Sequence, residues 1–594
     1  MICTIGPIPV RPRTSAPHLP SAALFLAVLF GSCSNRAPSV SSEAAAPAAA
    51  IEPDRIRREL EILIRQEFRL TGGMPVAARA CDSNIASDDC ARWRAFAGAL
   101  LGISERAPRD RYIQGQVVYS LVRGGAYDVA LAVLERCQVA AWWCAALRGF
   151  AMAESGRLVD AESTFDQALD LMSGVDYCVW TDVSPLLSGK AASVFDEASC
   201  SERRELLKLF WALADPAWSV AGNDRRVEHF NRKAWSALYD DALPDGQWQL
   251  PEHHVEVVRR GMDFYRSDAR WGQYCPIQWS RVSSRPPYPE DGYAWPKKWP
   301  VADWPHVWCR YFPDVRAYRV IPQQKALLDP YHASASDWPI EPNGSLESYV
   351  PSWGDLIQLD HAQVAFFERG DSLVAAAALD VPDDPMFRDT AHRGAFLFLH
   401  SGPDTALVTA AGSAREGGWT FRATAPRRRY VVGLEAVAES GIGRVRFGHG
   451  LPHDAAEFVR TSDILLYAGD GSAASDSLEA VVPLMRGSDR WSRDEVMGIF
   501  LEVYGGDDVA DFPVTIDLEQ ERGVLARLAE FVGIGGANAV NLQWSQPGAD
   551  GRIVLSFAMP LSELPVGRHT LRVSVSQPGA EPVTIEKSFL IASG

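Results

Sequence analysis

The hydrophobic pattern of the chain changes its period near residue 360. From residue 53 to 235, apolar residues recur at helical spacing, as at Ile56, Leu60 and Leu63. Beyond residue 360, short apolar runs of strand length are bounded by Gly, Pro and Asp. The change predicts a multidomain α+β chain with an all-α domain over 53–235 and a β-rich part that follows it.

Two stretches of the helical region resemble each other. Gly125 and Ala130 of the first align with Gly156 and Ala161 of the second, an offset of 31 residues. This pattern resembles the tetratricopeptide repeat, whose helix pairs use Gly at a tight turn and Ala where helices approach closely. The resemblance implies a helical-repeat domain that binds peptides or partner proteins. A generic helical bundle is the alternative.

The β-rich part divides into two successive groups of short runs. Their spacing predicts two immunoglobulin-like β-sandwiches, over residues 361–485 and 486–594, with a short helix at Val524–Phe531 in the second. The expected strands are Leu373–Val381, Ala395–His400, Trp419–Ala423, Tyr430–Val437, Val445–Phe447 and Ile464–Tyr467, then Val496–Tyr504, Val514–Leu518, Val540–Trp544, Ile553–Phe557, Leu571–Val575 and Val583–Ile591.

Residues 236–360 are rich in Trp and Pro. Of the 19 tryptophans of the chain, 12 lie between Trp211 and Trp353. Proline interrupts regular helices and central strands, and tryptophan supplies a large buried area. We therefore expect an irregular connector packed by its indoles. Exposed indoles that stack on sugar rings are the alternative.

The N-terminus has the pattern of an export signal. Arg11 and Arg13 precede the apolar run 24–30, which is too short to span a bilayer. Gly31-Ser32-Cys33 follows, and it resembles the lipobox of bacterial lipoproteins, where the cysteine is lipidated. The resemblance implies a signal peptide at 1–33, and an envelope protein facing the periplasm or the exterior. An ordinary secretory signal is the alternative.

Composition restricts the partners. Residues 34–52, rich in Ser, Ala and Pro, are expected to form a flexible tether. The formal net charge of -17 provides no basic surface for nucleic acid. Since no apolar run of 18 residues follows the signal, membrane contact is expected only through the lipid.

Eight cysteines follow Cys33, and all of them lie before residue 310. An even number in an exported chain predicts disulfides, although sequence alone leaves their connectivity open. A metal site is the alternative, but no CxxC pair occurs. Pairing of sequence neighbours gives Cys81–Cys90, Cys137–Cys144, Cys178–Cys200 and Cys275–Cys309.

A segment at the end of the helical region carries a further resemblance. It is similar to a family of exported bacterial proteins named for a GWxTD motif, although the literal string is absent. The family has no established activity, so the resemblance implies no reaction. Arg226 and Glu228 are expected to be structural charges around Asp215. The residues that carry the resemblance are Phe210, Trp211, Asp215, Pro216, Asn223, Arg226 and Glu228.

Catalytic signatures are absent from the sequence. It contains no GxSxG elbow, HExxH helix or Walker loop. A cluster of acidic residues could bind calcium, but an ordinary acidic loop is favoured. Histidines in a loop could bind a metal, but exposed histidines without a ligand are favoured. Glu228 and His229 are adjacent and are expected to point in different directions. The side chains considered for metal binding are Asp380, Asp383, Asp384 and Asp389, and His449, His453 and Asp454.

We therefore expect no catalytic residue, metal or cofactor. The favoured hypothesis is a non-enzymatic scaffold or adaptor that binds an envelope protein partner. A carbohydrate-binding or polysaccharide-processing protein, with a glycan as its ligand, is the alternative. A third hypothesis is an enzyme whose site is assembled from residues distant in the sequence.

Overall fold

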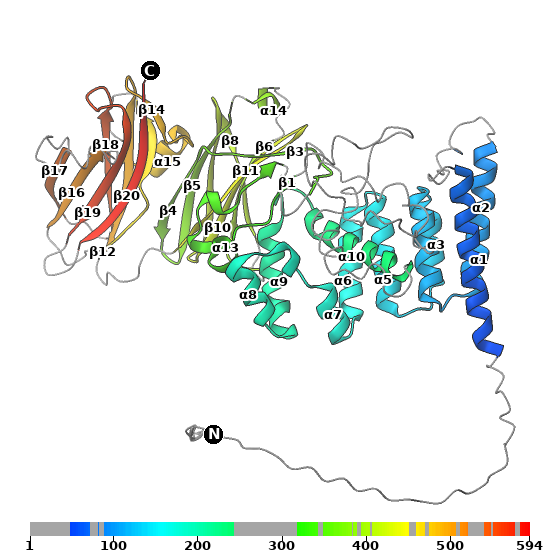
Figure 1. Ribbon diagram of the computed structural model, residues 1–594. Helices are drawn as coiled ribbons and strands as arrows, with labels where there is room; N and C mark the ends of the chain where they lie inside the picture. Colours follow the sequence, from blue (N-terminus) through cyan, green and yellow to red (C-terminus); the bar gives the residue numbers. More distant parts are fainter. Residues whose placement is uncertain are drawn as a thin grey trace, which may run out of the picture. The chain divides into compact units, whose positions relative to one another are not determined.

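The computed structural model contains helices in its N-terminal part and several β-sheets in its C-terminal part (Figure 1). From Glu52 onward the chain forms one compact unit, Glu52–Gly594. None of the described helices is both long and apolar enough to cross a membrane. The structure describes residues 48–71, 81, 88–242, 318–342, 349–382, 384–388, 394–403, 407–450, 459–469, 475–505, 511–520, 540–547, 551–576 and 582–593.

The first helices share one apolar core, which includes Leu100, Val117, Trp143 and Phe150. Helices α3 and α4 form one neighbouring pair, and α5 and α6 form the next. Helix α10 lies across α3, α5 and α6. The helices of this core are α1 (Ala48–Thr71), α2 (Asp88–Arg106), α3 (Arg111–Arg123), α4 (Tyr127–Leu134), α5 (Ala141–Glu154), α6 (Leu158–Leu171) and α10 (Asp224–Ala242).

The two turns inside these pairs have the same geometry. Gly125 has φ 76° and Gly156 has φ 82°, a region that favours glycine. The backbone N–H of each donates to the carbonyl three residues earlier, at 2.9 and 3.0 Å. Ala130 and Ala161 are both fully buried. The two expected similar stretches are therefore two helix pairs that end their first helix in the same way.

A second helical group surrounds a smaller core that includes Phe195, Leu207 and Ile321. Helix α9 begins with a capping box formed by Ser199 and Glu202. Residues 318–342, from the expected connector, form short elements, of which α13 contacts α8 and α9 whereas η5 and η6 contact strand β11 (Gly441–His449). The elements are α7 (Gly174–Trp180), η2 (Ser184–Leu186), α8 (Gly189–Glu197), α9 (Cys200–Ala214), β1 (Tyr318–Arg319), α13 (Gln324–Leu328), η5 (Pro330–His332), η6 (Ala335–Asp337) and β2 (Glu341–Pro342).

The first sheet pair encloses a core that includes Leu373, Leu397, Phe421 and Val432. One sheet has the order β3-β11-β10-β6-β7, and the other has the order β4-β5-β9-β8. The elements are β3 (Asp355–Gln358), β4 (Ala362–Arg369), β5 (Ser372–Asp380), α14 (Pro385–Arg388), β6 (Gly394–His400), β7 (Val408–Ala411), β8 (Ser413–Arg415), β9 (Gly418–Pro426), β10 (Tyr430–Ala438) and β11 (Gly441–His449).

The second sheet pair encloses a core that includes Ile499, Leu501, Val573 and Phe589. In one sheet β15 pairs with β12 and β13 and also with β18, and the other has the order β14-β20-β19-β16-β17. The elements are β12 (Val459–Thr461), β13 (Leu465–Gly469), α15 (Leu478–Val481), η7 (Val482–Leu484), β14 (Arg490–Ser492), β15 (Val496–Gly505), β16 (Asp511–Gln520), β17 (Val540–Pro547), β18 (Arg552–Pro560), β19 (Gly567–Val575) and β20 (Val583–Ala592).

Strand pairing places the domain boundaries differently from the expectation. Strand β3 pairs in parallel with β11, so the first sheet pair begins inside the expected connector 236–360. Strands β12 and β13 pair with β15, so the second sheet pair begins before residue 486. Helix α10 also continues past residue 235, to Ala242. The expected helix Val524–Phe531 lies outside the described residues.

Candidate functional sites at two buried polar junctions

Charged side chains cover part of the outer face of the β10–β11 hairpin. Leu434 and Val445 point into the core of the first sheet pair, so their neighbours point to the opposite face. These neighbours are Glu435, Arg444 and Arg446, and each is at most 1% exposed. Burial of three charged groups on one sheet face indicates a specific contact, because an unpaired buried charge is very costly.

The two arginines bind the end of helix α9. Arg444 Nη1 donates to the carbonyls of Asp215 and Pro216, at 2.9 and 2.6 Å. Arg446 Nη1 donates to the carbonyls of Leu213 and Asp215, at 3.2 and 2.6 Å. The last carbonyls of a helix lack intrahelical donors and form the negative end of its dipole. The two guanidinium groups therefore cap α9 from the first sheet pair.

Glu435 binds the backbone that follows α9. Its two carboxylate oxygens accept the backbone N–H groups of Trp218 and Ser219, both at 2.8 Å. One of these oxygens also lies 3.2 Å from Arg446 Nη2. The β10–β11 hairpin thus donates hydrogen bonds from its two arginines to the backbone carbonyls at the end of α9. Its glutamate accepts hydrogen bonds from the backbone N–H groups of the loop that follows α9. We call these contacts the helix–sheet junction.

The indole of Trp218 fills the space over Gly433 in this junction. A Cβ atom at Gly433 would lie 2.6 Å from the Trp218 ring. The Arg446 guanidinium lies 3.9 Å from the ring centroid, and the His400 ring stacks at 5.6 Å. Burial, with Arg446 as a second cause, lowers the pKa of His400 to about 4. His400 is therefore neutral at pH 7.

Burial also changes the pKa of other charged groups in the junction. It raises the pKa of Asp215 well above its usual value, although nearby Arg446 opposes this effect. It lowers the pKa of Arg444 to about 9, and Arg446 adds to the shift. The Asp215 carboxylate accepts the Ala217 N–H at 3.0 Å, while Tyr349 donates its hydroxyl to Asp224. These groups hold the chain's own segments together.

The residues of the GWxTD-like segment lie beside the junction. Phe210 and Trp211 belong to the core around α9. Asn223 caps α10, since its Oδ1 accepts the Arg226 N–H at 2.9 Å. Its Nδ2 also donates to the Trp211 carbonyl at 2.7 Å, which ties α10 to α9. The segment is thus a structural connection between two helices.

The charged residues Arg226 and Glu228 both form ion pairs. Arg226 pairs with Glu162 at 3.2 Å and with Asp166, and Glu228 pairs with Arg232. Arg226 and Glu228 are therefore structural charges, as expected, although these ion pairs do not include Asp215. The sheet supplies charges beside Asp215, and it lies more than 200 residues away in the sequence.

Glu228 and His229 point in different directions, as expected. The Glu228 side chain is 27% exposed and pairs with Arg232, whereas His229 is fully buried. The His229 ring lies 5.1 Å from the Trp211 ring, and neither ring nitrogen has a hydrogen-bond partner. Burial lowers the pKa of His229 well below its usual value. This geometry does not form an acid–base pair.

A second junction joins the two sheet pairs, and we call it the sheet–sheet junction. Strand β5 is buried on both faces. Ala375 and Ala377 face the core of the first sheet pair, while Ala376 and Ala378 contact a cluster that includes Phe500. Small side chains let other layers pack closely against both faces of one strand.

The free edge of strand β4 is covered by the second sheet pair. The Gln363 amide accepts the Leu466 N–H at 2.8 Å and donates to the Leu466 carbonyl at 2.9 Å. Asp463 Oδ2 accepts the Phe366 N–H at 2.9 Å. The Tyr504 hydroxyl accepts the Glu368 N–H at 2.9 Å. These bonds occupy an edge that would otherwise be open to pairing with another chain.

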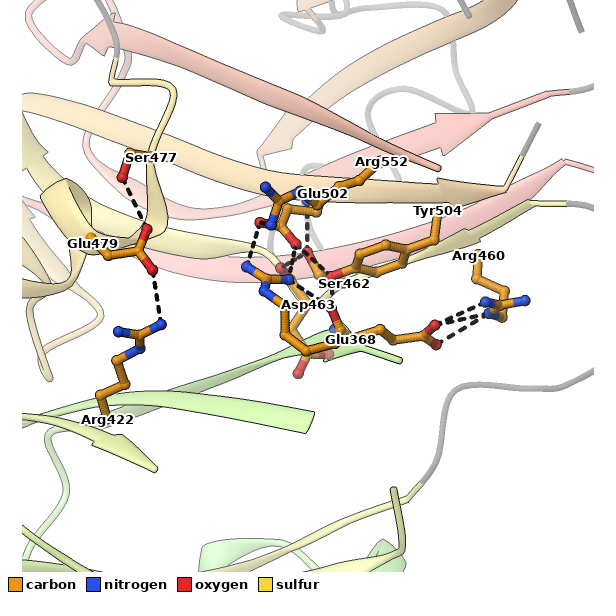
Figure 2. A network of polar contacts seen from close by, with 11 residues as sticks. Glu368, Arg422, Arg460, Ser462, Asp463, Ser477, Glu479, Glu502, Tyr504 and Arg552 are labelled. Carbon is orange, nitrogen blue, oxygen red and sulfur yellow. Dashed lines mark hydrogen bonds and ion pairs between the residues drawn. The ribbon is translucent and has the colours of Figure 1, made fainter. Parts of the chain in front are cut away.

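Two carboxylates anchor the ionic contacts of this junction (Figure 2). Glu502 is 1% exposed and accepts from Arg369 at 2.6 and 2.9 Å and from the Tyr504 hydroxyl at 2.8 Å. Glu368 lies 3.0 Å from Arg460. Because Glu502 is buried, its bidentate pairing with Arg369 replaces the water it would otherwise bind.

The described candidates for metal binding have structural contacts. Asp380 accepts the N–H groups of Gly487 and Ser488, at 3.0 and 2.8 Å, and pairs with Arg415. Asp384 accepts the Met386 N–H at 2.8 Å. Within the described part of the chain, no group of three His, Cys, Asp or Glu could hold a metal ion.

His449 lies at the sheet–sheet junction. Its ring stacks on Phe366 at 3.9 Å, and its Nδ1 lies 3.8 Å from Asp463 Oδ2. This histidine is therefore largely enclosed by protein and is not a free loop ligand. Asp383, Asp389, His453 and Asp454 lie outside the described residues.

Three disulfides join the expected neighbours. They are Cys81–Cys90, Cys137–Cys144 and Cys178–Cys200, with Cα atoms 4.8, 6.0 and 5.7 Å apart. The second bridges the two helix pairs, and the third ties α7 to α9. Cys33, Cys275 and Cys309 lie outside the described residues.

The described tryptophans are all buried or partly buried. Trp143 and Trp338, for example, are at most 1% exposed. Of the tryptophans in the expected connector, the structure describes Trp338 and Trp353, and these two are packed as expected. The tryptophans from Trp248 to Trp308 lie outside the described residues.

No family model matches this sequence, and no curated protein matches it. Among solved structures, the chain is similar to the crystal structure of red sea bream transglutaminase at 8% identity, with a TM-score of 0.12. The match covers 40% of this chain and 32% of the transglutaminase chain. A likeness at this level carries no argument about fold or activity.

Proposed function

We propose that this chain is an exported, lipid-anchored envelope protein that acts as a non-enzymatic scaffold or adaptor. The observation that carries the proposal is the helix–sheet junction, where Glu435, Arg444 and Arg446 bind the loop after α9. Buried ionisable groups in an active site act on a ligand, whereas these act on the chain itself. A body held together in this way suits the presentation of binding surfaces.

The compartment is argued from the cysteines. Disulfides persist in oxidising environments such as the periplasm and the cell surface. Three disulfides in the helical region are consistent with export through the signal at residues 1–33. Lipidation at Cys33 would then anchor the mature chain to a membrane.

The partner would bind outside the face that α10 covers. Helix α10 buries Phe230, Ala234 and Leu238 against α3, α5 and α6. Gln116 Nε2 donates to the Leu238 carbonyl at 2.8 Å, which fixes α10 on α3. A partner would therefore bind the outer surfaces of the tetratricopeptide-like helix pairs. The immunoglobulin-like sheet pairs would provide further binding surfaces.

The proposal is tested by crosslinking the tagged protein in living cells and identifying the captured proteins by mass spectrometry. Cys33→Ala is the matched control, because it removes the anchor and leaves the folded body unchanged. Recovery of one envelope complex, lost in the control, supports the proposal. Recovery of glycan without any protein partner overturns it in favour of the carbohydrate-binding alternative.

A further inference from the structure

The turn between β9 and β10 carries three consecutive arginines, Arg427, Arg428 and Arg429. It is the only run of three basic residues in the whole sequence. The turn is held at both ends. The Tyr430 hydroxyl donates to the Pro426 carbonyl at 2.6 Å, and the Arg427 N–H donates to the Asp371 carbonyl at 3.1 Å. The arginines therefore extend from a fixed backbone.

Two carboxylates at this end of the molecule are already engaged. Glu368 pairs with Arg460 and lies 3.4 Å from Arg427. Glu502 pairs with Arg369 and lies 3.5 Å from Arg552 (Figure 2). These contacts link the turn to the arginines of the sheet–sheet junction, and they use both carboxylates.

Arg428 and Arg429 remain exposed, and in the described part of the chain neither forms an ion pair. Asp371, whose backbone carbonyl accepts the Arg427 N–H, is also exposed. Among the described residues, six arginines thus share this end with four carboxylates, which are Glu368, Asp371, Asp463 and Glu502. The described residues at this end therefore include more positive than negative groups, whereas the whole chain has a formal charge of -17. Such a local excess attracts an anion to one place.

We propose that Arg428 and Arg429 form a docking point for a short acidic segment of a partner protein. The proposal rests on the proposed scaffold function, and it names the chemistry of the partner. Guanidinium groups bind carboxylates through paired hydrogen bonds. The site is small, so it attracts a short acidic segment. A long polyanion would extend beyond the turn, where the acidic remainder of the chain repels it.

The test measures the binding of fluorescein-labelled oligoglutamate to the mature chain by fluorescence anisotropy, at low and at high ionic strength. Arg428→Gln/Arg429→Gln is the test variant. Arg58→Gln/Arg94→Gln is the control, because it removes the same charge from two exposed helical arginines without ion pairs in the described part of the chain. Both variants are first compared with the parent by circular dichroism and thermal unfolding.

The expected result is binding that weakens about tenfold in the test variant, since two exposed charged contacts are lost. The control variant should bind as the parent does, and high salt should reduce binding. Equal losses in both variants would overturn the proposal, as would binding of oligogalacturonate or of anionic vesicles without binding of oligoglutamate. Loss of the expected anisotropy result would not change the outcome of crosslinking in living cells. The docking proposal and the scaffold proposal can therefore be rejected independently.

Discussion

Single buried residues hold the helix–sheet junction, and Glu435 is one of them. Its carboxylate serves two backbone N–H groups and one guanidinium at once. Without it, these donors would be buried without an acceptor. Removal of one member of a buried pair typically costs about 3–5 kcal/mol.

Glu435→Ala should therefore lower the free energy of unfolding by about 3–5 kcal/mol, measured by urea denaturation. Glu416→Ala is the matched control, because Glu416 is exposed and forms no ion pair in the described part of the chain. The control should change stability by less than about 0.5 kcal/mol. Equal effects of the two substitutions would show that Glu435 is not a structural anchor.

Gly433 is the second residue that decides the junction. A methyl group at this position would overlap the Trp218 ring, so Gly433→Ala should cost about 1–3 kcal/mol through overpacking. Gly98→Ala is the control. Nothing lies within 4 Å of its added Cβ, and the change should stabilise helix α2 by about 0.5–1 kcal/mol. Opposite signs in thermal unfolding are the expected result, and a neutral Gly433→Ala would contradict the packing argument.

His400 should make the junction sensitive to acid. Its folded pKa of about 4 lies below the ordinary 6.5, so the folded state excludes a proton that the unfolded state binds. The stability that neutral His400 contributes is complete above pH 6.5, and it is lost as the pH falls towards 4. The difference corresponds to about 3 kcal/mol.

His400→Phe keeps a ring beside Trp218 and removes this proton linkage. Urea denaturation from about pH 7.5 down to about pH 4 should show that the parent loses about 3 kcal/mol more than the variant. The raised pKa of Asp215 acts in the opposite sense, since its contribution falls as the pH rises. It is present in both proteins and cancels in the comparison. Parallel curves for the two proteins would refute the role of His400.

At the scale of elements, the edge of β4 depends on one side chain. Gln363→Ala removes the amide that pairs with both backbone groups of Leu466, and it leaves them buried without partners. The expected cost is about 1–3 kcal/mol, with faster amide exchange at Leu466. Gln543→Ala on the exposed face of edge strand β17 is the control. Unchanged exchange at Leu466 would show that the edge is protected by other contacts.

The sequence predicted strands better than their pairing. The apolar runs at Leu373–Val381 and Tyr430–Val437 correspond to β5 and β10, because a buried strand needs such a run wherever it lies. Pairing depends on contacts between distant residues, so the sequence did not reveal that β13 joins β15. The equivalent turns at Gly125 and Gly156 were predictable because they are local.

The candidate site was predictable only in part. The GWxTD-like residues Trp211 and Asn223 do lie beside the junction, and the resemblance directed attention to them. Arg444 and Arg446 alternate with apolar residues, a pattern that indicates a solvent-facing strand side. This side of the strand is buried only because the loop after α9 packs over the two arginines. No local pattern in the sequence predicts that contact.

At the scale of the whole molecule, the junctions should make unfolding cooperative. The helix–sheet junction connects the loop after α9 to β10 and β11, and the sheet–sheet junction connects β4 to β13. Units that share buried charged contacts stabilise one another, so their unfolding transitions merge.

Scanning calorimetry of the parent should therefore show one dominant transition. In Glu435→Ala, the helical region should unfold separately and at a lower temperature than the sheet pairs, while Glu416→Ala keeps the profile of the parent. Two resolved transitions already present in the parent would mean that the buried charges join the surfaces without coupling their stability, and a scaffold built on them would then be hinged rather than rigid.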